Sequence, residues 1–352
     1  MKVLFPVIVA LAVVGCATAS SPTAKSANSI RGAFPLLVTP WTAEAELDVE
    51  VLVKEAGFVN DCGVGGVIWP TAGEVIGTLS DDEYERGLDA LAARAAKPDF
   101  TARLTAICPG KTSDAALARV QLVNRLQKKH NVKMAILARP PDDATNETAI
   151  VAHYRALGKI AECPVIIQTF NGKSPQQSIA SIIALAKDFP DVYGYVKEES
   201  PGLKVNDRIA QLVAAQPAIK TVFSGWGAKG FLYQGPRLGT RGIITQRPAY
   251  ADLLAYIFKR VDEGDDGTLV DAYSKLLLMY NLGDVFDNSD DTMRGPHLYV
   301  LEKRGVFKNR FTRVKAPKGS AKKWTVKDFP LTNLQKAEID MRLEAIKPYL
   351  KK

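Results

Sequence analysis

A lysine stands near the end of an apolar segment that predicts a short buried strand, VYGYVKEES, residues 192–200. In a strand, residues two apart share a face. The alternation divides this segment into two sets: Val192, Gly194 and Val196 on one face, and Tyr193, Tyr195, Lys197 and Glu199 on the other. The first set suits packing beneath a layer of helices. We therefore expect the second set to point into the interior of the protein.

An amine held in an apolar site can attack a carbonyl carbon and form a Schiff base. Lys197 is the candidate for this chemistry. The alternative is an ion pair of Lys197 with Glu198 or Glu199 at the edge of the core. The strand taken alone leaves both interpretations open.

A second segment, PTAGE at residues 70–74, predicts a site for a carboxylate. A turn of this kind presents backbone N–H groups together with the hydroxyl of Thr71. Two other glycine-containing segments lack the context for phosphate binding. PGKTSD, residues 109–114, has Thr105 where a phosphate-binding loop needs glycine, so we interpret it as a helix-capping turn. GVGG, residues 63–66, precedes a strand rather than following one, which argues against a dinucleotide site.

Between residues 30 and 250, eight short apolar segments alternate with segments of helical periodicity. The apolar segments are AFPLLVTPW, GGVIWP, RLTAICP, VKMAILARP, PVIIQTF, VYGYVKE, IKTVFSGW and GIITQ. Helix-start signals lie between them, including a capping box of Ser80 and Glu83. This order predicts an α/β protein built as a (β/α)8 TIM barrel. Residues 251–352 show amphipathic segments without strand signals, so we expect a C-terminal helical extension there.

Active sites of such barrels lie at the C-terminal ends of the strands, which is where Lys197 is expected. Here the chain resembles the dihydrodipicolinate synthase / N-acetylneuraminate lyase family. LLVTPWTAEAELD, PTAGE with TLSDDE, GYVKEES and VFSGW occur in the family's order, and the resemblance spans residues 30–352. It implies a class I aldolase-type barrel that binds pyruvate or a related 2-oxo acid as a Schiff base. It also implies a homo-oligomer that needs no metal and no organic cofactor, since the protonated imine is itself the electron sink.

The resemblance also implies roles for individual residues. Lys197 aligns with the Schiff-base lysine of the family. Thr71 and the backbone of Ala72 align with the cradle for the substrate carboxylate. Gly225 and Ile244 align with residues that line the keto-acid pocket.

Three positions depart from the family's pattern. Ala72 replaces a second threonine, which removes a hydroxyl from the cradle. ARPPDD puts Pro141 or a neighbour where the family has a proton-relaying tyrosine, and Gln168 stands where a Tyr-Asn pair is common. Losing a positioned acid or base costs about 10²–10⁴-fold in rate. One hypothesis is that Tyr195, on the strand face of Lys197, compensates as a catalytic residue; filling the barrel core is the alternative.

Two functions of different classes follow. The first is a lyase or synthase that makes or breaks a C–C bond next to a 2-oxo acid, or dehydrates a sugar acid. For an exported protein, catabolism of sugar acids or sialic-acid-like compounds fits better than lysine biosynthesis, whose substrates are cytoplasmic. The second is a catalytically degenerate barrel that acts as a periplasmic binding or scaffold protein.

The N-terminal sequence MKVLFPVIVALAVVGC, residues 1–16, predicts a signal peptide that ends in a lipobox-like VVGC. Its apolar run is too short to span a bilayer comfortably. We expect Cys16 to be lipidated, residues 17–29 to form a polar tether, and the protein to face the periplasm from the outer membrane. This lipid anchor is the membrane contact that we expect.

Composition limits the other partners. The net charge of +8 is concentrated after residue 302, where 15 Lys and Arg face 4 Asp and Glu, a balance of +11. A solvated surface is the simplest interpretation, and without an aromatic-interleaved basic motif we expect no nucleic-acid partner. Cys62, Cys108 and Cys163 are too widely spaced for a disulfide framework and are predicted to be buried thiols. The three histidines do not cluster with cysteines, so no zinc site is predicted.

Overall fold

The structure is a computed structural model that describes residues 30–169, 175–202, 204–225, 228–282 and 295–351. The predicted signal peptide, the tether and Cys16 lie outside the described residues. No helix in the described part of the chain is long and apolar enough to cross a membrane.

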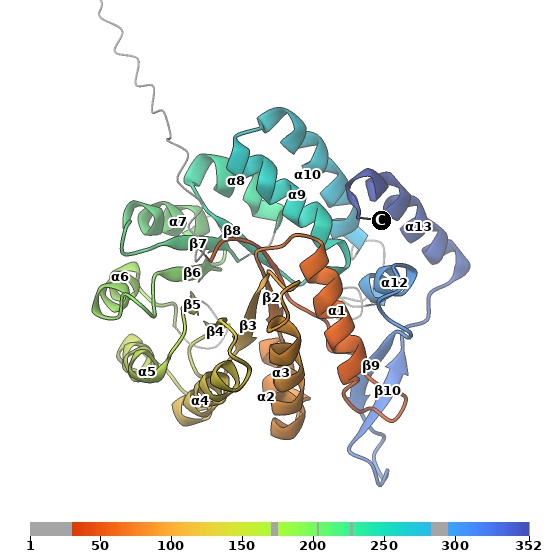
Figure 1. Ribbon diagram of the computed structural model, residues 1–352, viewed down its shortest axis with the longest axis horizontal. Helices are drawn as coiled ribbons and strands as arrows, with labels where there is room; N and C mark the ends of the chain where they lie inside the picture. Colours follow the sequence, from red (N-terminus) through yellow and green to blue (C-terminus); the bar gives the residue numbers. More distant parts are fainter. Residues whose placement is uncertain (1–29, 170–174, 203, 226–227, 283–294, 352) are drawn as a thin grey trace, which may run out of the picture.

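Eight parallel strands form one sheet in the order β1-β8-β7-β6-β5-β4-β3-β2 (Figure 1). The strands are β1 Gly32–Pro35, β2 Gly66–Trp69, β3 Arg103–Ile107, β4 Met134–Ala138, β5 Val165–Gln168, β6 Tyr195–Glu198, β7 Thr221–Ser224 and β8 Gly242–Thr245. The sheet closes between β1 and β2, where Leu36 bridges Ile68 and the N–H of Gly65 donates to the carbonyl of Ala33 at 3.0 Å. The predicted (β/α)8 TIM barrel is therefore confirmed, and each of the eight apolar segments overlaps one of its strands.

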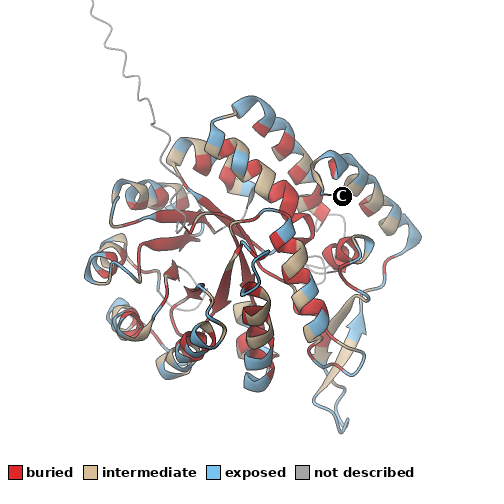
Figure 2. Cartoon of the chain, in the orientation of Figure 1, coloured by how far each residue is buried: buried red, intermediate tan, exposed pale blue. Residues whose placement is uncertain are grey.

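Helices between the strands form the outer layer of the barrel. They are α1 Val49–Asp61, α2 Ala72–Gly77, α3 Asp81–Ala95, α4 Ser113–His130, α5 Glu147–Ile160, α6 Ile179–Asp188, α7 Lys204–Ala214 and α8 Ala228–Leu238. The predicted capping box at the start of α3 is present, with Ser80 and Glu83 bonded reciprocally. The hydroxyl of Thr112 accepts from the N–H of Ala115 and caps α4, so PGKTSD is the capping turn that was predicted. Helix faces toward the strands are buried and outward faces exposed (Figure 2).

Large aromatic side chains fill the inside of the barrel. Phe34 and Phe223 meet edge to face, with ring centroids 5.1 Å apart. Glycines make room for them: a Cβ on Gly66 would lie 2.2 Å from the Phe34 ring, and one on Gly242 would lie 2.1 Å from the Phe223 ring. The barrel interior is thus a packed core rather than a pore, with room for a reaction only toward its ends.

The strand β6 begins later than predicted. Gly194 has a φ of +117°, a conformation that interrupts the alternation of side chains before Tyr195. Tyr195 lies inside the barrel as expected, but the prediction for Tyr193 was wrong. Tyr193 packs in the outer layer against Tyr154, with ring centroids 6.2 Å apart.

The region after residue 250 is more varied than predicted. Helix α9, Ala251–Glu263, follows β8 and packs against β1, so the barrel's ring of helices extends past the expected boundary at residue 250. The remaining elements are η1 Pro248–Tyr250, α10 Asp266–Tyr280, α12 Gly295–Lys303, β9 Phe311–Lys315, β10 Trp324–Asp328, α13 Asn333–Ile346 and η3 Lys347–Tyr349. The predicted C-terminal helices are present, and in addition β9 and β10, which were not predicted, form an antiparallel hairpin beside α1 (Figure 1).

An arginine attaches this hairpin to the barrel. The guanidinium of Arg313, on β9, forms a buried ion pair with Glu83 at the start of α3, one contact being 2.8 Å. It also donates to the carbonyls of Ala45 and Thr78, at 2.8 and 3.0 Å, and lies 3.9 Å from the ring centroid of Trp41. Part of the basic C-terminal charge therefore has a structural role.

Cys62, Cys108 and Cys163 are buried and free, as predicted. Burial raises the pKa of each thiol to about 12, which keeps them protonated near neutral pH.

Candidate active site at the C-terminal end of the barrel

Lys197 lies inside the barrel near the C-terminal end of β6, and 8% of its surface is exposed. Its Nζ is 2.9 Å from each carboxylate oxygen of Glu199. The sequence left a nucleophile and an ion pair as alternatives, and the structure contains the ion pair with Glu199. The pair does not exclude the nucleophile, because the amine remains at the end of the barrel where substrates bind.

Glu199 is held in place from several sides. Its Oε2 accepts a hydrogen bond of 2.7 Å from the side chain of Gln168 at the end of β5. Its backbone N–H donates to the hydroxyl of Thr169 at 3.1 Å. Gly225 lies against it, since a Cβ added there would be 2.9 Å from the Cβ of Glu199. The structure thus brings Gly225, a predicted pocket residue, beside the Lys197–Glu199 pair.

Glu198, the other predicted ion-pair partner of Lys197, has different contacts. Its side chain is fully buried and accepts from Arg208 at 3.1 Å, and from the backbone N–H of Ser200 at 2.9 Å. Because consecutive strand residues point to opposite faces, Glu198 belongs to the helix side and Glu199 to the barrel side.

Thr71 caps the short helix α2 at the C-terminal end of β2. Its hydroxyl donates to Glu74 Oε2 at 2.9 Å and accepts from the N–H of Glu74 at 3.3 Å. Its own N–H donates to the same carboxylate at 2.9 Å. Since α2 begins at Ala72, the N–H groups of Ala72 and Gly73 have no acceptor in a preceding turn of the helix. Ala72 packs against the residues that fill the barrel, so this turn faces the mouth.

Tyr195 and Ile244 both belong to the cluster of side chains inside the barrel. Tyr195 is the first residue of β6, and its charged neighbours lie at the same N-terminal end of the barrel. Lys220 Nζ is 5.5 Å from its ring centroid. Burial raises the pKa of Tyr195, and the nearby Arg103 opposes this rise. These groups lie at the end of the barrel opposite to the mouth.

A pair of charged side chains that the sequence analysis did not consider lies after β4. Arg139 donates to Asp142 at 2.8 Å, and both side chains are largely buried. Leu137 faces the barrel interior and pairs with Ile166, so the alternation places Arg139 on the interior face beside Gln168. These residues occupy the rim near Pro141. An arginine directly after a strand of the barrel is the signal that would have found this pair.

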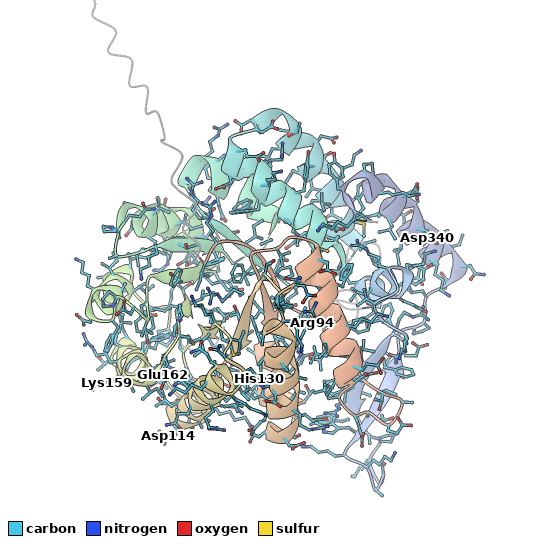
Figure 3. All side chains as sticks on the ribbon, viewed as in Figure 1. Arg94, Asp114, His130, Lys159, Glu162 and Asp340 are labelled. Atoms are coloured by element: carbon cyan, nitrogen blue, oxygen red, sulfur yellow. The ribbon has the colours of Figure 1, made fainter. Side chains whose placement is uncertain are left out.

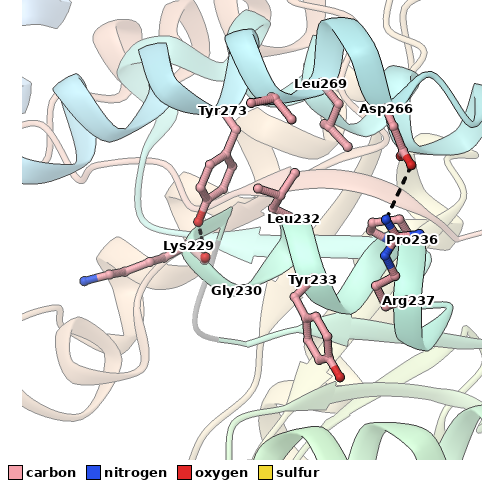
Figure 4. Close-up of a pocket in the computed structure, with 10 residues that line it drawn as sticks. Lys229, Gly230, Leu232, Tyr233, Pro236, Arg237, Asp266, Leu269 and Tyr273 are labelled. Carbon is pink, nitrogen blue, oxygen red and sulfur yellow. Dashed lines mark hydrogen bonds and ion pairs between the residues drawn. The ribbon is translucent and has the colours of Figure 1, made fainter.

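A separate groove of about 440 Å³ lies outside the barrel, between α8 and α10 (Figure 4). Its walls include Leu232, Tyr233, Leu269 and Val270. Its polar contacts are internal, such as the ion pair of Arg237 with Asp266 at 3.5 Å. The groove is lined by outer helices rather than by strand ends, so it does not form part of the candidate site.

The fold and the position of Lys197 define a class of protein, namely (β/α)8 barrels with a lysine on the sixth strand. No family model matches the chain. A solved dihydrodipicolinate synthase from Aquifex aeolicus has a similar fold, with a TM-score of 0.68 and 19% identity. That likeness covers 92% of this chain and 100% of the other.

Curated proteins agree with this likeness. A 4-hydroxy-tetrahydrodipicolinate synthase of Chlorobium luteolum is 23% identical over 329 residues, which is 91% of this chain and 99% of that protein. One from Rhizobium meliloti is 25% identical over 166 residues, 47% of this chain and 54% of the relative, so this match spans about half of the relative's length. The chain is thus similar in sequence to 4-hydroxy-tetrahydrodipicolinate synthases, in line with the resemblance that the motifs indicated, and it shares the fold of a solved dihydrodipicolinate synthase.

Proposed function

We propose that this protein is a Schiff-base-forming lyase or synthase of the dihydrodipicolinate synthase / N-acetylneuraminate lyase family. Its substrate is pyruvate or a related 2-oxo acid, and Lys197 is the covalent nucleophile. The observation that carries this proposal is the position of Lys197, inside the barrel at the C-terminal end of β6 with a carboxylate at its nitrogen.

The remaining predicted residues have binding roles in this proposal. Thr71 and the backbone of Ala72 hold the carboxylate of the 2-oxo acid, and Gly225 and Ile244 line its pocket. Two contacts support the assignment: Ala72 packs against the barrel interior, and Gly225 lies against Glu199. The protonated imine withdraws electrons from the adjacent carbon, so the reaction needs no metal or organic cofactor.

The proposal is tested by trapping the imine. The mature protein is incubated with pyruvate, or with other 2-oxo acids, and borohydride reduces any imine to a stable secondary amine. We expect a mass increase that peptide mapping locates to Lys197. Absence of an adduct with every 2-oxo acid tried would refute Schiff-base chemistry in this protein.

A second candidate function is binding without catalysis. The observation in its favour is the rim after β4, where Pro141 and the Arg139–Asp142 pair occupy the region expected to hold a proton-relaying tyrosine. A degenerate barrel would still bind a 2-oxo acid without forming an imine. Calorimetric binding of pyruvate by protein that borohydride leaves unmodified would favour this periplasmic binding or scaffold function.

Replacing Tyr195 by phenylalanine is expected to change the rate of imine formation by less than about tenfold. The reason is that Tyr195 and its charged neighbours lie at the N-terminal end of the barrel, opposite to the mouth. Loss of a true acid or base costs about 100-fold or more. The measurement is the rate of borohydride-trapped adduct in Tyr195→Phe and wild type. A loss of about 100-fold would instead assign the hydroxyl of Tyr195 a catalytic role.

We propose export, lipidation at Cys16 and anchoring at the periplasmic face of the outer membrane, supported by the apolar run that ends in VVGC. Cys16→Ala is the test, because it should release the protein from the membrane fraction. We also propose a homo-oligomer, which sedimentation of the mature protein would test.

A further inference from the structure

We propose that Glu199 is the acid and base that moves protons during imine formation at Lys197. This inference rests on the proposed Schiff-base function and assigns that function a proton-transfer group. It gives the Lys197–Glu199 pair a chemical role in addition to an electrostatic one. Glu199 touches the reacting nitrogen, so the role is catalytic rather than one of positioning.

The geometry is suited to direct proton transfer. Both oxygens of Glu199 lie 2.9 Å from Lys197 Nζ, within the range of about 2.6–3.2 Å that proton transfer requires. The two side chains are only 10% and 19% exposed, so bulk water does not easily replace either partner. A carboxylate that already shares a hydrogen with the amine is ready to accept it.

The surroundings of Glu199 fix the carboxylate on this side of the barrel. The Gln168 amide donates to Oε2, and Thr169 accepts from the backbone N–H. Gly225 lacks the Cβ that would collide with Glu199, so the strand β7 can approach closely. Gln168 is therefore a positioning residue, because it acts through the carboxylate that it orients.

The rest of the site explains why a carboxylate is required. Imine formation needs one group that removes a proton from nitrogen and returns it to the departing oxygen. After β4 the chain has Pro141 and the Arg139–Asp142 ion pair in place of the expected tyrosine, and the Asp142 carboxylate is bound to its own arginine. Tyr195 is at the opposite end of the strand from the mouth. Glu199 supplies the group from the same strand end as the amine.

The proton transfers balance without another reactant. Glu199 first takes a proton from the Lys197 ammonium, and the neutral amine adds to the ketone carbon as the C=O π bond breaks. Glu199 gives its proton to the new alkoxide and takes one from the nitrogen, which yields the neutral carbinolamine. It then protonates the hydroxyl, which leaves as water while the nitrogen lone pair forms the C=N bond. The products are a protonated imine, water and the Glu199 carboxylate.

The experiment follows the rate of imine formation in matched variants. Wild type, Glu199→Gln and Glu199→Asp are mixed with pyruvate and quenched with borohydride at successive times, and the modified fraction is read by mass. The control is Glu162→Gln, the same carboxylate-to-amide change in an exposed pair with Lys128 at the edge of the molecule (Figure 3). Thermal unfolding shows that each variant is folded.

We expect Glu199→Gln to form the adduct about 100-fold or more slowly, Glu199→Asp to recover part of the rate, and Glu162→Gln to match wild type. An ion pair without a catalytic role predicts a different result, because removing it releases the amine. An unchanged or faster rate in Glu199→Gln would therefore overturn the inference.

The two proposals fail in different ways. If wild type forms no adduct, the proposed function is wrong, and this inference fails with it. If wild type forms the adduct and folded Glu199→Gln does so equally fast, only the role of Glu199 is wrong. Should Glu199→Gln not fold, Glu199→Ala takes its place, because an unchanged rate in a folded variant without any carboxylate at this position would overturn the inference.

Discussion

Lys197→Arg is expected to abolish the borohydride-trapped adduct and to lower turnover by at least about 10⁴-fold. A lost covalent step leaves only the contribution of binding and of the other catalytic groups, as in enzymes whose nucleophile is removed. Arginine keeps the positive charge and can bond to the Glu199 carboxylate in two places. Its guanidinium remains protonated and is not a nucleophile under these conditions. The change therefore removes the chemistry of Lys197 while it retains the ion pair.

Three measurements distinguish the possible roles of Lys197. Trapping and turnover report the nucleophile, calorimetric binding of pyruvate reports the pocket, and urea unfolding reports the ion pair. We expect Lys197→Arg to lose the trapped adduct and the turnover. Its free energy of unfolding should stay within about 1 kcal/mol of wild type, because the charge is retained. Lys197→Met, which removes the charge as well, serves as the companion variant. Turnover that persists in Lys197→Arg would show that Lys197 serves an ion pair and that the active site lies elsewhere.

The barrel and its mouth could be predicted because their signals are local. Each strand is a short apolar run between helix-start signals, and eight such units leave few other architectures. Lys197 was placed correctly because Tyr195 and Lys197 lie two apart on one strand face. The same alternation separates Glu199, on the barrel side, from Glu198, on the helix side. The alternation of side chains therefore predicts Glu199, rather than Glu198, as the partner of Lys197.

The errors arose where backbone conformation or tertiary contacts override the pattern. The sequence does not reveal that Gly194 has a positive φ, because a glycine at this position is also compatible with a regular strand. Tyr193 was therefore assigned to the wrong face. The hairpin of β9 and β10 was missed because its strands are charged and only partly buried. Its stability depends on contacts with α3 and with the loop before α1, which lie more than 200 residues earlier in the chain.

Those contacts predict a large loss of stability when the side chain of Arg313 is removed. We expect Arg313→Met to destabilise the protein by about 3–5 kcal/mol, because the Glu83 carboxylate would remain buried without its partner. Methionine retains much of the packing volume against Trp41. Urea unfolding at neutral pH measures the loss. Arg86→Met is the matched control, since its pair with Asp82 is exposed on both sides and should contribute at most about 1 kcal/mol.

The dependence on pH of the stability lost in Arg313→Met identifies the cause of that loss. Burial tends to raise the pKa of Glu83, but hydrogen bonds from Arg313 and Ser80 outweigh it and hold the pKa below its ordinary value. A depressed pKa in the folded state gives stability that is present above the unfolded value of about 4.3 and is lost as pH falls through the folded value. Without Arg313, burial dominates and favours the protonated acid. The deficit of Arg313→Met should therefore be smaller at about pH 4 than at neutral pH.

A second substitution separates the ion pair from the other contacts of Arg313. Glu83→Gln in the Arg313→Met background removes the buried charge, and glutamine can still complete the capping box with Ser80 at the start of α3. The double variant should therefore recover part of the lost stability, and its stability relative to wild type should be less sensitive to acid. A deficit that is equal at both pH values, and that Glu83→Gln does not reduce, would assign the loss to the bonds with Ala45 and Thr78. In that case the hairpin would be attached to the barrel by backbone contacts rather than by charge.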